Sequence, residues 1–486
     1  MMCTLVKFMR GWGRNILAGS STSRVRRKAI IASCFSRHYG SALFISGKVA
    51  HKTFAFLTPY LDVEERFANM EKLQEEIALR GMDIDVVQLK NSWEFYRQMN
   101  MDKRALEDRL AELKNSKKQL KRSEQTSEIQ QELHKLGLQQ KVIQEDIKTM
   151  KQAIWDMDDN VVRRVLKLPN NLDPRTPIVE SMVLRSVGNA PDSSVPESRT
   201  HVEIGTRLGL LKYQNPMSYY LCNKAALFEL GVLAHADRVL IDGDNMLKVI
   251  GTDFGRSLVV EGLGLDHEDP MSAFLIENHE EVERDSSNRM HLIGGACLPS
   301  FLTLHAKQLI NPNDFPLKYL ATGRQYTPSP ADSALCGLFT ACQASVAHVF
   351  TMVKDGKSEE YRTLFDQLVD NVCRLYDDLC DHYRVVMKSA PQLEPWESLR
   401  VSFELWSPSA KRYIEVGHLS ACGDYFSKRL LITYQTSTGR SFPAAITGTV
   451  LSVPRLLGCL LEQNPHKFVI PPKVAELAPS GDCVAV

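Results

Sequence analysis

The fold of the first half of this chain is decided by residues 129–161, which read IQQELHKLGLQQKVIQEDIKTMKQAIWDMDDNV. Seam residues recur through this stretch at alternating steps of four and three: Ile129, Leu133, Leu136, Gln140, Ile143, Ile147, Met150, Ile154, Met157 and Val161. Gln140 is the one polar interruption. This spacing places an apolar seam along one face of a helix and is typical of a coiled coil.

A second seam precedes the first and is formed by Leu106, Leu110, Leu113 and Leu120. The polar residues 122–127 separate the two seams. Two heptad helices joined by a short polar turn predict an antiparallel helical hairpin, which we assign to a coiled-coil arm over residues 101–166. The alternative is a helix pair within a larger bundle, but the positions around the seams are so polar that little remains to bury a third layer.

The arm is preceded by a predicted N-terminal helical region, residues 40–100. Within it, apolar residues recur at three- and four-residue steps, namely Val63, Phe67, Met70 and Leu73. A linker is expected over residues 167–200, because Leu168-Pro169-Asn170 and a run rich in proline and serine at 189–199 interrupt any regular pattern.

The remaining residues, 201–486, show a different pattern, in which helix-like and strand-like stretches alternate. Helical stretches are expected at 217–236, 356–388 and 450–463, and strand-like stretches at Leu317–Tyr319, Leu399–Leu405 and Leu430–Tyr434. Strands far apart in the sequence with helices between them indicate an α+β domain with an antiparallel or mixed sheet.

The amino-terminal end is basic and free of acidic residues. Ten Lys and Arg residues precede the first acidic residue, Asp62. Residues 1–39 are rich in Arg and Ser with short apolar runs, a composition that predicts a mitochondrial transit peptide; a disordered basic tail is the alternative. Arg37-His38-Tyr39-Gly40 resembles an Arg-x-Tyr processing site, so the mature chain is expected to begin near Gly40.

Composition limits what the mature chain can be. Of the 59 basic residues eight lie in residues 1–39, so with 58 acidic residues the remainder carries a net charge of −7. This excludes a uniformly basic nucleic-acid coat and leaves local contacts only. No run approaches the roughly 18 apolar residues of a membrane span. The 11 cysteines contain no CxxC pair, so we expect a soluble matrix protein with neither a zinc site nor a disulfide framework.

Several segments in the second half carry a family resemblance. They are His201-Val202-Glu203-Ile204-Gly205, Ala225-Ala226-Leu227-Phe228-Glu229-Leu230, Phe403-Glu404-Leu405-Trp406-Ser407-Pro408, residues 415–429 (EVGHLSACGDYFSKR) and residues 470–479 (IPPKVAELAP). Together, and in this order, they resemble the seryl-tRNA synthetase family over roughly residues 62–480. The resemblance implies a helical-hairpin arm followed by a class II synthetase-like antiparallel sheet domain flanked by helices, usually in a homodimer.

The family's serine site contains a Thr-x-Glu after a short apolar strand. In this chain the matching run is 292–297, so the threonine becomes Gly295 and the glutamate becomes Cys297. A buried serine ammonium without its counter-charge costs several kcal/mol, and we expect serine not to bind well. An active enzyme would need another acid here, and Glu261 and Asp266 are the nearest candidates.

The ATP site implied by the resemblance is also altered. The family's Phe-Arg-x-Glu is represented by Arg324-Gln325-Tyr326, which keeps an arginine but replaces the acid with Tyr326. The following strand, residues 340–348, has lost most of the family's basic, aromatic and acidic groups.

The glycine-rich third motif is reduced in the same way. Val450 and Pro454 stand where the family often has glycine, although Arg455 remains. Glu415 is retained as a possible Mg²⁺ ligand, but His418 replaces a coordinating serine. Arg324, Glu415 and Arg455 are therefore remnants of an ATP site, and the alternative is that they form ordinary ion pairs. Since all three subsites are altered, we predict a non-catalytic protein that uses no cofactor and no metal; a divergent active ligase is the rival.

Two binding functions follow from these features. The arm tip contains Lys114, Lys117, Lys118, Lys121 and Arg122 with no acid among them, so it is a candidate contact for tRNA or other nucleic acid, or simply a solvated tip. The helix 225–235 and an expected strand at 238–241 resemble the family's apolar dimer surface. They predict a heterodimer with the catalytic mitochondrial seryl-tRNA synthetase, or alternatively a homodimer.

Overall fold

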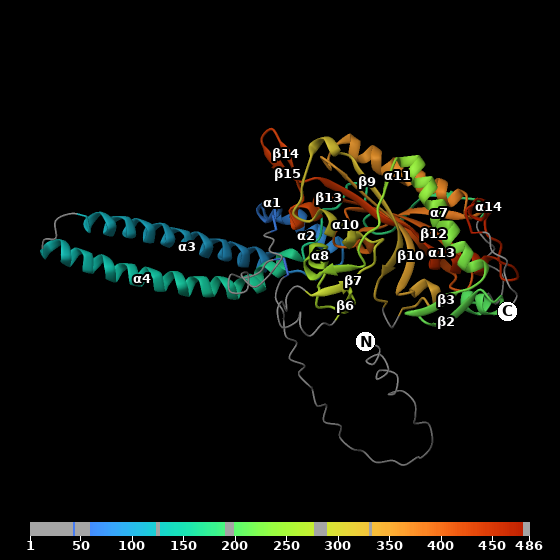
Figure 1. The fold of residues 1–486 in the computed structure, drawn as a ribbon, viewed down its shortest axis with the longest axis horizontal. Coiled ribbons are helices and arrows are strands. Elements are labelled where there is room, and N and C mark those ends of the chain that lie inside the picture. The colour runs from blue at the N-terminus through green and yellow to red at the C-terminus, as the bar shows by residue number, and fades with distance from the viewer. Residues whose placement is uncertain are drawn as a thin grey trace, which may run out of the picture. The chain divides into compact units, whose positions relative to one another are not determined.

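The structure is a computed structural model that describes residues 42–43, 59–122, 127–189, 199–276, 289–329 and 333–479 (Figure 1). The predicted transit peptide, the expected mature start at Gly40, most of the hairpin turn and most of the proline- and serine-rich run lie outside these residues. None of the helices that the structure describes combines the length and apolar character needed to cross a bilayer.

The N-terminal helices form a small core around the base of the arm. They are α1 (Val63–Ala68), α2 (Met70–Leu79) and α5 (Arg163–Leu166). Phe67, Leu73 and Ile77 from α1 and α2 are buried against Leu89 and Val165. The predicted recurrence at three- and four-residue steps therefore marks the face that packs inward.

The arm consists of two long helices lying side by side, α3 (Val86–Leu120) and α4 (Ser127–Met157), followed by one π-helical turn (Asp158–Val162) (Figure 1). The Asp85 side chain caps α3 by accepting a hydrogen bond from the amide of Gln88. Ile143, Ile147 and Ile154 of the predicted seam are buried. The polar interruption also has a partner, because Lys117 Nζ donates to Gln140 Oε1 at 3.3 Å.

The second half is built on an eight-stranded sheet. In spatial order its strands are β1 (Met182–Val187), β11 (Tyr383–Met387), β12 (Leu399–Ser407), β13 (Arg412–Gly423), β16 (Ala444–Ser452), β10 (Gln343–Val353), β9 (Leu317–Tyr326) and β4 (Leu247–Lys248). Neighbouring strands are antiparallel except β4 and β9, which are parallel. The predicted α+β class with a helical hairpin and an antiparallel sheet flanked by helices is confirmed.

Helices cover both faces of this sheet. One core contains residues of α7 (Lys224–Asp244), α11 (Glu359–Asp377) and α13 (Val453–Gln463), and the other contains residues of α8 (Ser257–Gly262), α10 (Leu298–His305) and α12 (Tyr425–Leu430). β10 serves both cores, since Ala347 and Val349 point into the first and Val346 and Phe350 into the second.

Smaller elements surround the sheet. They are α6 (His201–Arg207), α14 (Pro472–Ala475), the hairpin β2 (Leu211–Asn215) and β3 (Ser218–Leu221), the sheet of β5 (Phe254–Arg256), β7 (Met290–Leu292) and β6 (Phe274–Ile276), and the sheet of β15 (Gly439–Ser441), β14 (Thr433–Thr436) and β8 (Leu309–Ile310). Thr200 and Glu203 form a capping box at the start of α6.

Some expected element types were wrong. Residues 238–241, expected as a strand of the dimer surface, are helical and belong to α7. The run Val239-Leu240-Ile241 suggests a strand, but Val232, Ala236 and Leu240, spaced by four, are all fully buried along the helix. Tertiary burial of a helical stripe therefore outweighed local β propensity.

Two further stretches contain both element types. The expected helix over 356–388 is α11 followed by β11, and the expected strand Leu430–Tyr434 contains the last residue of α12 and the beginning of β14. In both stretches a buried helix and a buried strand are separated by only a few residues, so the apolar pattern shows no clear boundary.

Candidate functional site

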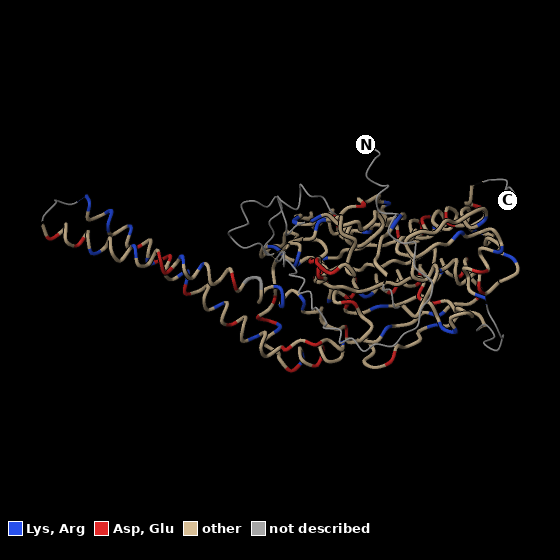
Figure 2. The backbone as a smooth tube through the Cα atoms, turned by 90° about the horizontal axis from the view of Figure 1, so that it is seen from below, with Lys and Arg blue, Asp and Glu red and all other residues tan. Residues whose placement is uncertain are grey.

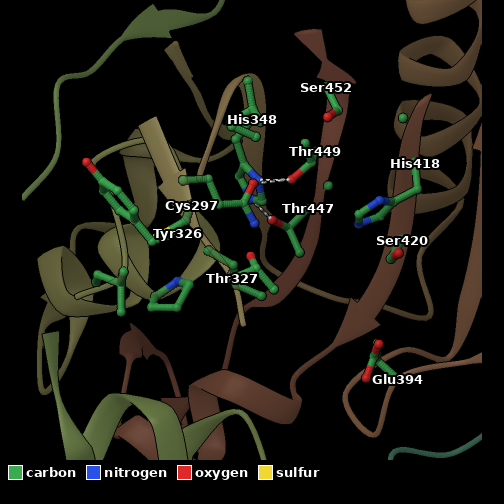
Figure 3. A pocket seen from close by; sticks show the side chains of 18 of the residues that line it. Cys297, Tyr326, Thr327, His348, Glu394, His418, Ser420, Thr447, Thr449 and Ser452 are labelled. Atoms are coloured by element: carbon green, nitrogen blue, oxygen red, sulfur yellow. Dashed lines mark hydrogen bonds between the residues drawn. The ribbon is translucent and has the colours of Figure 1, made fainter. Parts of the chain in front are cut away.

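A cavity of about 320 Å³ lies among the ends of β9, β10, β13 and β16, the start of α13 and the segment 394–400 (Figure 3). Its wall includes Cys297, His348, Arg400, Glu415 and Arg455. Three of the predicted site residues, Cys297, Glu415 and Arg455, therefore meet in this one place, although Cys297 is more than a hundred residues from the other two in the chain.

Cys297, which the sequence motif aligns with the family's serine-binding acid, lines the cavity and gives it no negative charge. Its side chain is buried and its thiol donates to the carbonyl of Gly294 at 2.9 Å. Burial raises the pKa of the Cys297 thiol to about 12. The group is thus neutral at physiological pH and cannot balance an ammonium.

Gly295, the other predicted serine-site residue, is not among the residues that line the cavity. Its amide donates to Asp253 Oδ1 at 2.8 Å, and a Cβ at this position would stand 2.9 Å from the carbonyl oxygen of Gly251. That distance is shorter than Cβ atoms normally make, so the backbone around Gly251 and Gly295 is packed too closely to accept a side chain at position 295 without shifting.

Neither candidate replacement acid lies on the cavity wall. Glu261 Oε2 accepts hydrogen bonds from the amides of Ala42 and Leu43 at 2.5 and 2.7 Å. Asp266 caps the amide of Glu268 and pairs with Lys167 at 3.4 Å. Both face a separate small hollow, so the idea that either could substitute for the lost acid is wrong.

Glu415 is in the cavity, but other side chains have engaged its carboxylate. Arg400 Nη2 donates to Oε1, Ser402 Oγ donates to Oε2 at 2.5 Å, and His418 Nδ1 lies 3.5 Å from Oε1. Burial alone would raise the pKa of Glu415, but the Arg400 guanidinium and the bonds from His418 and Ser402 hold it well below its ordinary value.

The two arginines of this cluster are partly buried beside Glu415. Arg400 Nη1 also lies 3.5 Å from Glu397 Oε1, and the pKa of Arg400 rises because the charges of Glu415 and Glu397 outweigh burial. Arg455 Nη1 donates to the carbonyl oxygen of Glu415 at 3.3 Å, and burial lowers the pKa of Arg455. Both guanidiniums remain charged at neutral pH.

Arg324, the third predicted remnant, is not on the cavity wall. Its Nη2 pairs with Glu229 of α7 at 3.3 Å, and the same carboxylate accepts from Ser345 Oγ at 2.8 Å. The next three residues, 325–327, line the cavity instead. The prediction that Arg324 belongs with Glu415 and Arg455 in one site is therefore wrong: it forms an ion pair with Glu229 instead.

Two functional positions were not singled out from the sequence. His348 lies in the wall with Nδ1 3.0 Å from Thr449 Oγ1 and Nε2 2.9 Å from Thr447 Oγ1 (Figure 3). Burial lowers the pKa of His348 to about 3, so the ring is neutral. Arg400 was missed too, although an arginine between the buried residues Leu399 and Val401 is a usable signal of a buried ion pair.

The basic residues at the arm tip divide into two groups. Lys114, Lys118, Lys121 and Arg122 are exposed, and positive charge is visible at that end of α3 in Figure 2. Lys117 instead occupies a seam position, partly buried against Gln140.

The fold and cavity define a class II aminoacyl-tRNA synthetase fold. Residues 281–464 match the family described as the tRNA synthetase class II core domain (G, H, P, S and T). A seryl-tRNA synthetase from Pyrococcus horikoshii, solved with ATP, superposes with a TM-score of 0.70 at 18% identity, over 88% of this chain and all of that one. A cytoplasmic serine-tRNA ligase from Naegleria fowleri, solved with AMP, gives a TM-score of 0.66 at 17% identity over 86% of this chain and 97% of that one.

Sequence comparison finds relatives named as serine–tRNA ligases or as serine–tRNA synthetase-like. The serine–tRNA synthetase-like protein Slimp of Drosophila melanogaster is 26% identical over 87% of this chain and 89% of its own length. The mitochondrial serine–tRNA ligase of Mus musculus is 25% identical over 84% of this chain and 80% of its own length. The chain is therefore a seryl-tRNA synthetase-like protein, as its sequence motifs predict.

Proposed function

We propose that this chain is a non-catalytic seryl-tRNA synthetase-like protein of the mitochondrial matrix. It acts by binding, as a partner of the catalytic mitochondrial seryl-tRNA synthetase in mitochondrial translation. The location is supported by the basic, acid-free leader over residues 1–39 and by the mitochondrial ligase among the relatives.

The observation that carries the proposal is the contact between Arg400 and Glu415. Adenylate formation needs Mg²⁺ held by carboxylate oxygens next to the triphosphate. Here a guanidinium and a serine hydroxyl take the two oxygens of Glu415. A cation tethered to the chain thus neutralises the acid, and a metal would have to displace a buried ion pair, which costs several kcal/mol.

The serine side of the cavity supports the same conclusion. The wall residue at the position of the expected acid is the neutral thiol of Cys297, and Glu261 and Asp266 are engaged elsewhere. The solved structures compared above contain ATP and AMP, so retention of nucleotide binding without adenylation is the main rival.

Serine-dependent ATP–pyrophosphate exchange tests the loss of catalysis. The catalytic mitochondrial seryl-tRNA synthetase, assayed in parallel, provides the positive control. We expect no serine-dependent exchange from this chain and no tight binding of a seryl-adenylate analogue. Exchange above background, or tight analogue binding that Arg455→Ala abolishes, would contradict the proposal.

The apolar residues expected to form the dimer surface on helix 225–235 are largely used within this chain, since Ala225, Phe228 and Val232 are fully buried. We therefore place the proposed partner surface around β4 and β5 instead. Leu247, Ile250 and Phe254 are 62%, 89% and 51% exposed, a run of large apolar side chains that a partner would cover. A second copy of this chain could use the same surface, so a homodimer is the alternative.

Native mass spectrometry after co-expression with the catalytic enzyme separates the two assemblies. We expect a heterodimer, abolished by Ile250→Asp. Val179→Asp is the matched control, because Val179 is also an exposed aliphatic residue, 78% accessible, on a different part of the chain. If only homodimers form at micromolar concentration, the heterodimer proposal is wrong.

A second candidate function, nucleic-acid binding by the arm, is favoured by the four exposed cations at its tip. Each phosphate contact changes log Kd by about 0.7 to 0.9 per tenfold change in salt. Replacing Lys114, Lys118, Lys121 and Arg122 with serine should therefore weaken RNA binding and flatten its salt dependence. Unchanged binding would show that the tip is merely solvated.

A further inference from the structure

We propose that the root of the arm, meaning the N-terminal helical region up to Arg80 and the linker residues 166–173, sets the shape of the cavity. These residues bind the backbone of the segment 394–398, which forms part of the cavity wall. Through this contact the two parts of the chain are energetically coupled. The inference is independent of the proposed function, since it holds whether or not the cavity is catalytic.

Arg80, at the C-terminal end of α2, makes the central contact. Its Nη1 donates to the carbonyl oxygen of Glu394 at 3.2 Å, and its Nη2 donates to those of Glu397 at 2.6 Å and Asn170 at 3.0 Å. The residue is 6% exposed. A guanidinium buried to this degree is costly unless its donors are satisfied, so the carbonyls must remain in place for Arg80 to stay buried.

The linker binds the three carbonyls of the segment that Arg80 does not contact, those of residues 395, 396 and 398. Asn170 donates from its amide to Pro395 at 2.7 Å and from Nδ2 to Trp396 at 2.9 Å. The amide of Asp173 donates to the carbonyl of Ser398 at 2.9 Å. Five consecutive carbonyls, 394–398, are thus bound by the arm's root and linker.

The same segment forms the wall of the cavity. Glu394, Trp396 and Glu397 line it. Glu397 Oε1 accepts from Ser420 Oγ at 2.6 Å, inside the cavity, and Arg400 pairs with the same oxygen. The turn 394–398 therefore has its backbone bound by the root of the arm, while its side chain Glu397 is bound by residues of the cavity wall.

A second contact joins the same two regions. Arg429 of α12 donates to the carbonyls of Leu166 and Leu168 at 3.1 Å, and Lys428 pairs with Asp62 at 2.8 Å. Helix α12 follows directly on β13, the strand that carries Glu415 and Ser420. A displacement of the arm's root would therefore move two parts of the cavity wall, the turn 394–398 and strand β13.

Hydrogen–deuterium exchange of the full mature chain measures this coupling in both directions. The amides of Asn170 and Asp173 report the linker side, and those of Glu394 and Glu397 report the turn. Arg80→Lys keeps the charge but cannot span three carbonyls. It should accelerate exchange at Glu394 and Glu397 by at least about fivefold, the lower end of typical coupling between sites.

The cavity-side change is Ser420→Ala, which removes the bond to Glu397 without uncovering a basic group. It should accelerate exchange at Asn170 and Asp173 by a similar factor, across the turn from the substitution. A merely structural role for Arg80 would not predict this reverse effect.

Matched controls use the same substitutions elsewhere. Arg97→Lys lies on the exposed face of α3, and Ser452→Ala lies on the far wall of the same cavity, so neither should change exchange at the reporter amides. The coupling does not exist if Arg80→Lys leaves exchange at Glu394 and Glu397 unchanged and Ser420→Ala leaves exchange at Asn170 and Asp173 unchanged. It is also refuted if the effects of the two substitutions on the exchange free energies of these amides are simply additive in the double variant. Should Arg80→Lys fail to fold, Ser420→Ala alone decides the question.

Discussion

Restoring the family's serine-binding residues should not restore serine activation. The variant Gly295→Thr/Cys297→Glu reinstates the Thr-x-Glu pair in sequence. Two costs follow from the surroundings of these positions: a buried charge at position 297 and a steric clash at position 295.

The charge is the larger obstacle. Burial raises the pKa of the Cys297 thiol from 9.0 to about 12, so a negative charge at this position costs about 4 kcal/mol more than in water, at 1.36 kcal/mol per pKa unit. An introduced glutamate facing the same burial would have its pKa raised well above its ordinary value. The protonated, neutral form would be favoured, and that form is a poor partner for an ammonium.

The threonine adds a steric cost. Its Cβ would lie 2.9 Å from the carbonyl oxygen of Gly251, so the loop must shift, at about 1 to 3 kcal/mol. The double variant should therefore lose about 5 kcal/mol, a large share of the 5–15 kcal/mol by which domains are stable.

Urea unfolding across pH separates the two costs. The matched control is Gly295→Thr/Cys297→Gln, which has the same size and no charge. The Glu variant holds a proton when folded that it loses when unfolded, so its stability should fall relative to the Gln variant as pH rises from about 4.3 to 7. Parallel pyrophosphate exchange should show no serine dependence in either variant. Serine-dependent turnover by the Glu variant, or equal stability of the two variants at pH 7, would refute this reasoning.

Three further outcomes are expected. Because burial lowers the pKa of His348 to about 3, the unfolded chain binds a proton that the folded chain does not, and this residue should lower stability by up to about 1.4 kcal/mol per pH unit as the pH falls from 6.5 to 3. In melts followed by circular dichroism, His348→Gln should remove this contribution and make the pH dependence shallower, while His291 keeps its own contribution. A chain beginning at position 44 should be less stable than one beginning at position 40 by at least about 2 kcal/mol, since it lacks the fully buried Leu43 and both amides bound by Glu261, and equal melting temperatures would contradict this. Lys117→Ala should change the thermal stability of the hairpin more than Lys118→Ala does, because Lys117 alone of the two is in the seam.

The sequence by itself determined the features that depend on local periodicity. Seam residues at steps of four and three specify the hairpin, since only a helix brings those positions to one face. The loss of charge at Cys297 could also be predicted, because one substitution in a short motif removes a functional group wherever the motif is placed. Residues 238–241 show the limit: a short apolar run fits both a strand and a buried helix, and the long stripe of α7 decided between them.

The tertiary structure decided which charges meet. Arg324 and Arg455 looked equivalent in the sequence, but alternation along β9 turns Arg324 towards Glu229, while Arg455 at the start of α13 reaches the cavity. Arg400 and Glu415 lie on neighbouring strands, so the ion pair between them depends on the register of β12 against β13. The turn at residues 408–411 helps to fix that register, but the irregularity between Phe403 and Glu404 shifts it, and this shift is visible only in the folded sheet.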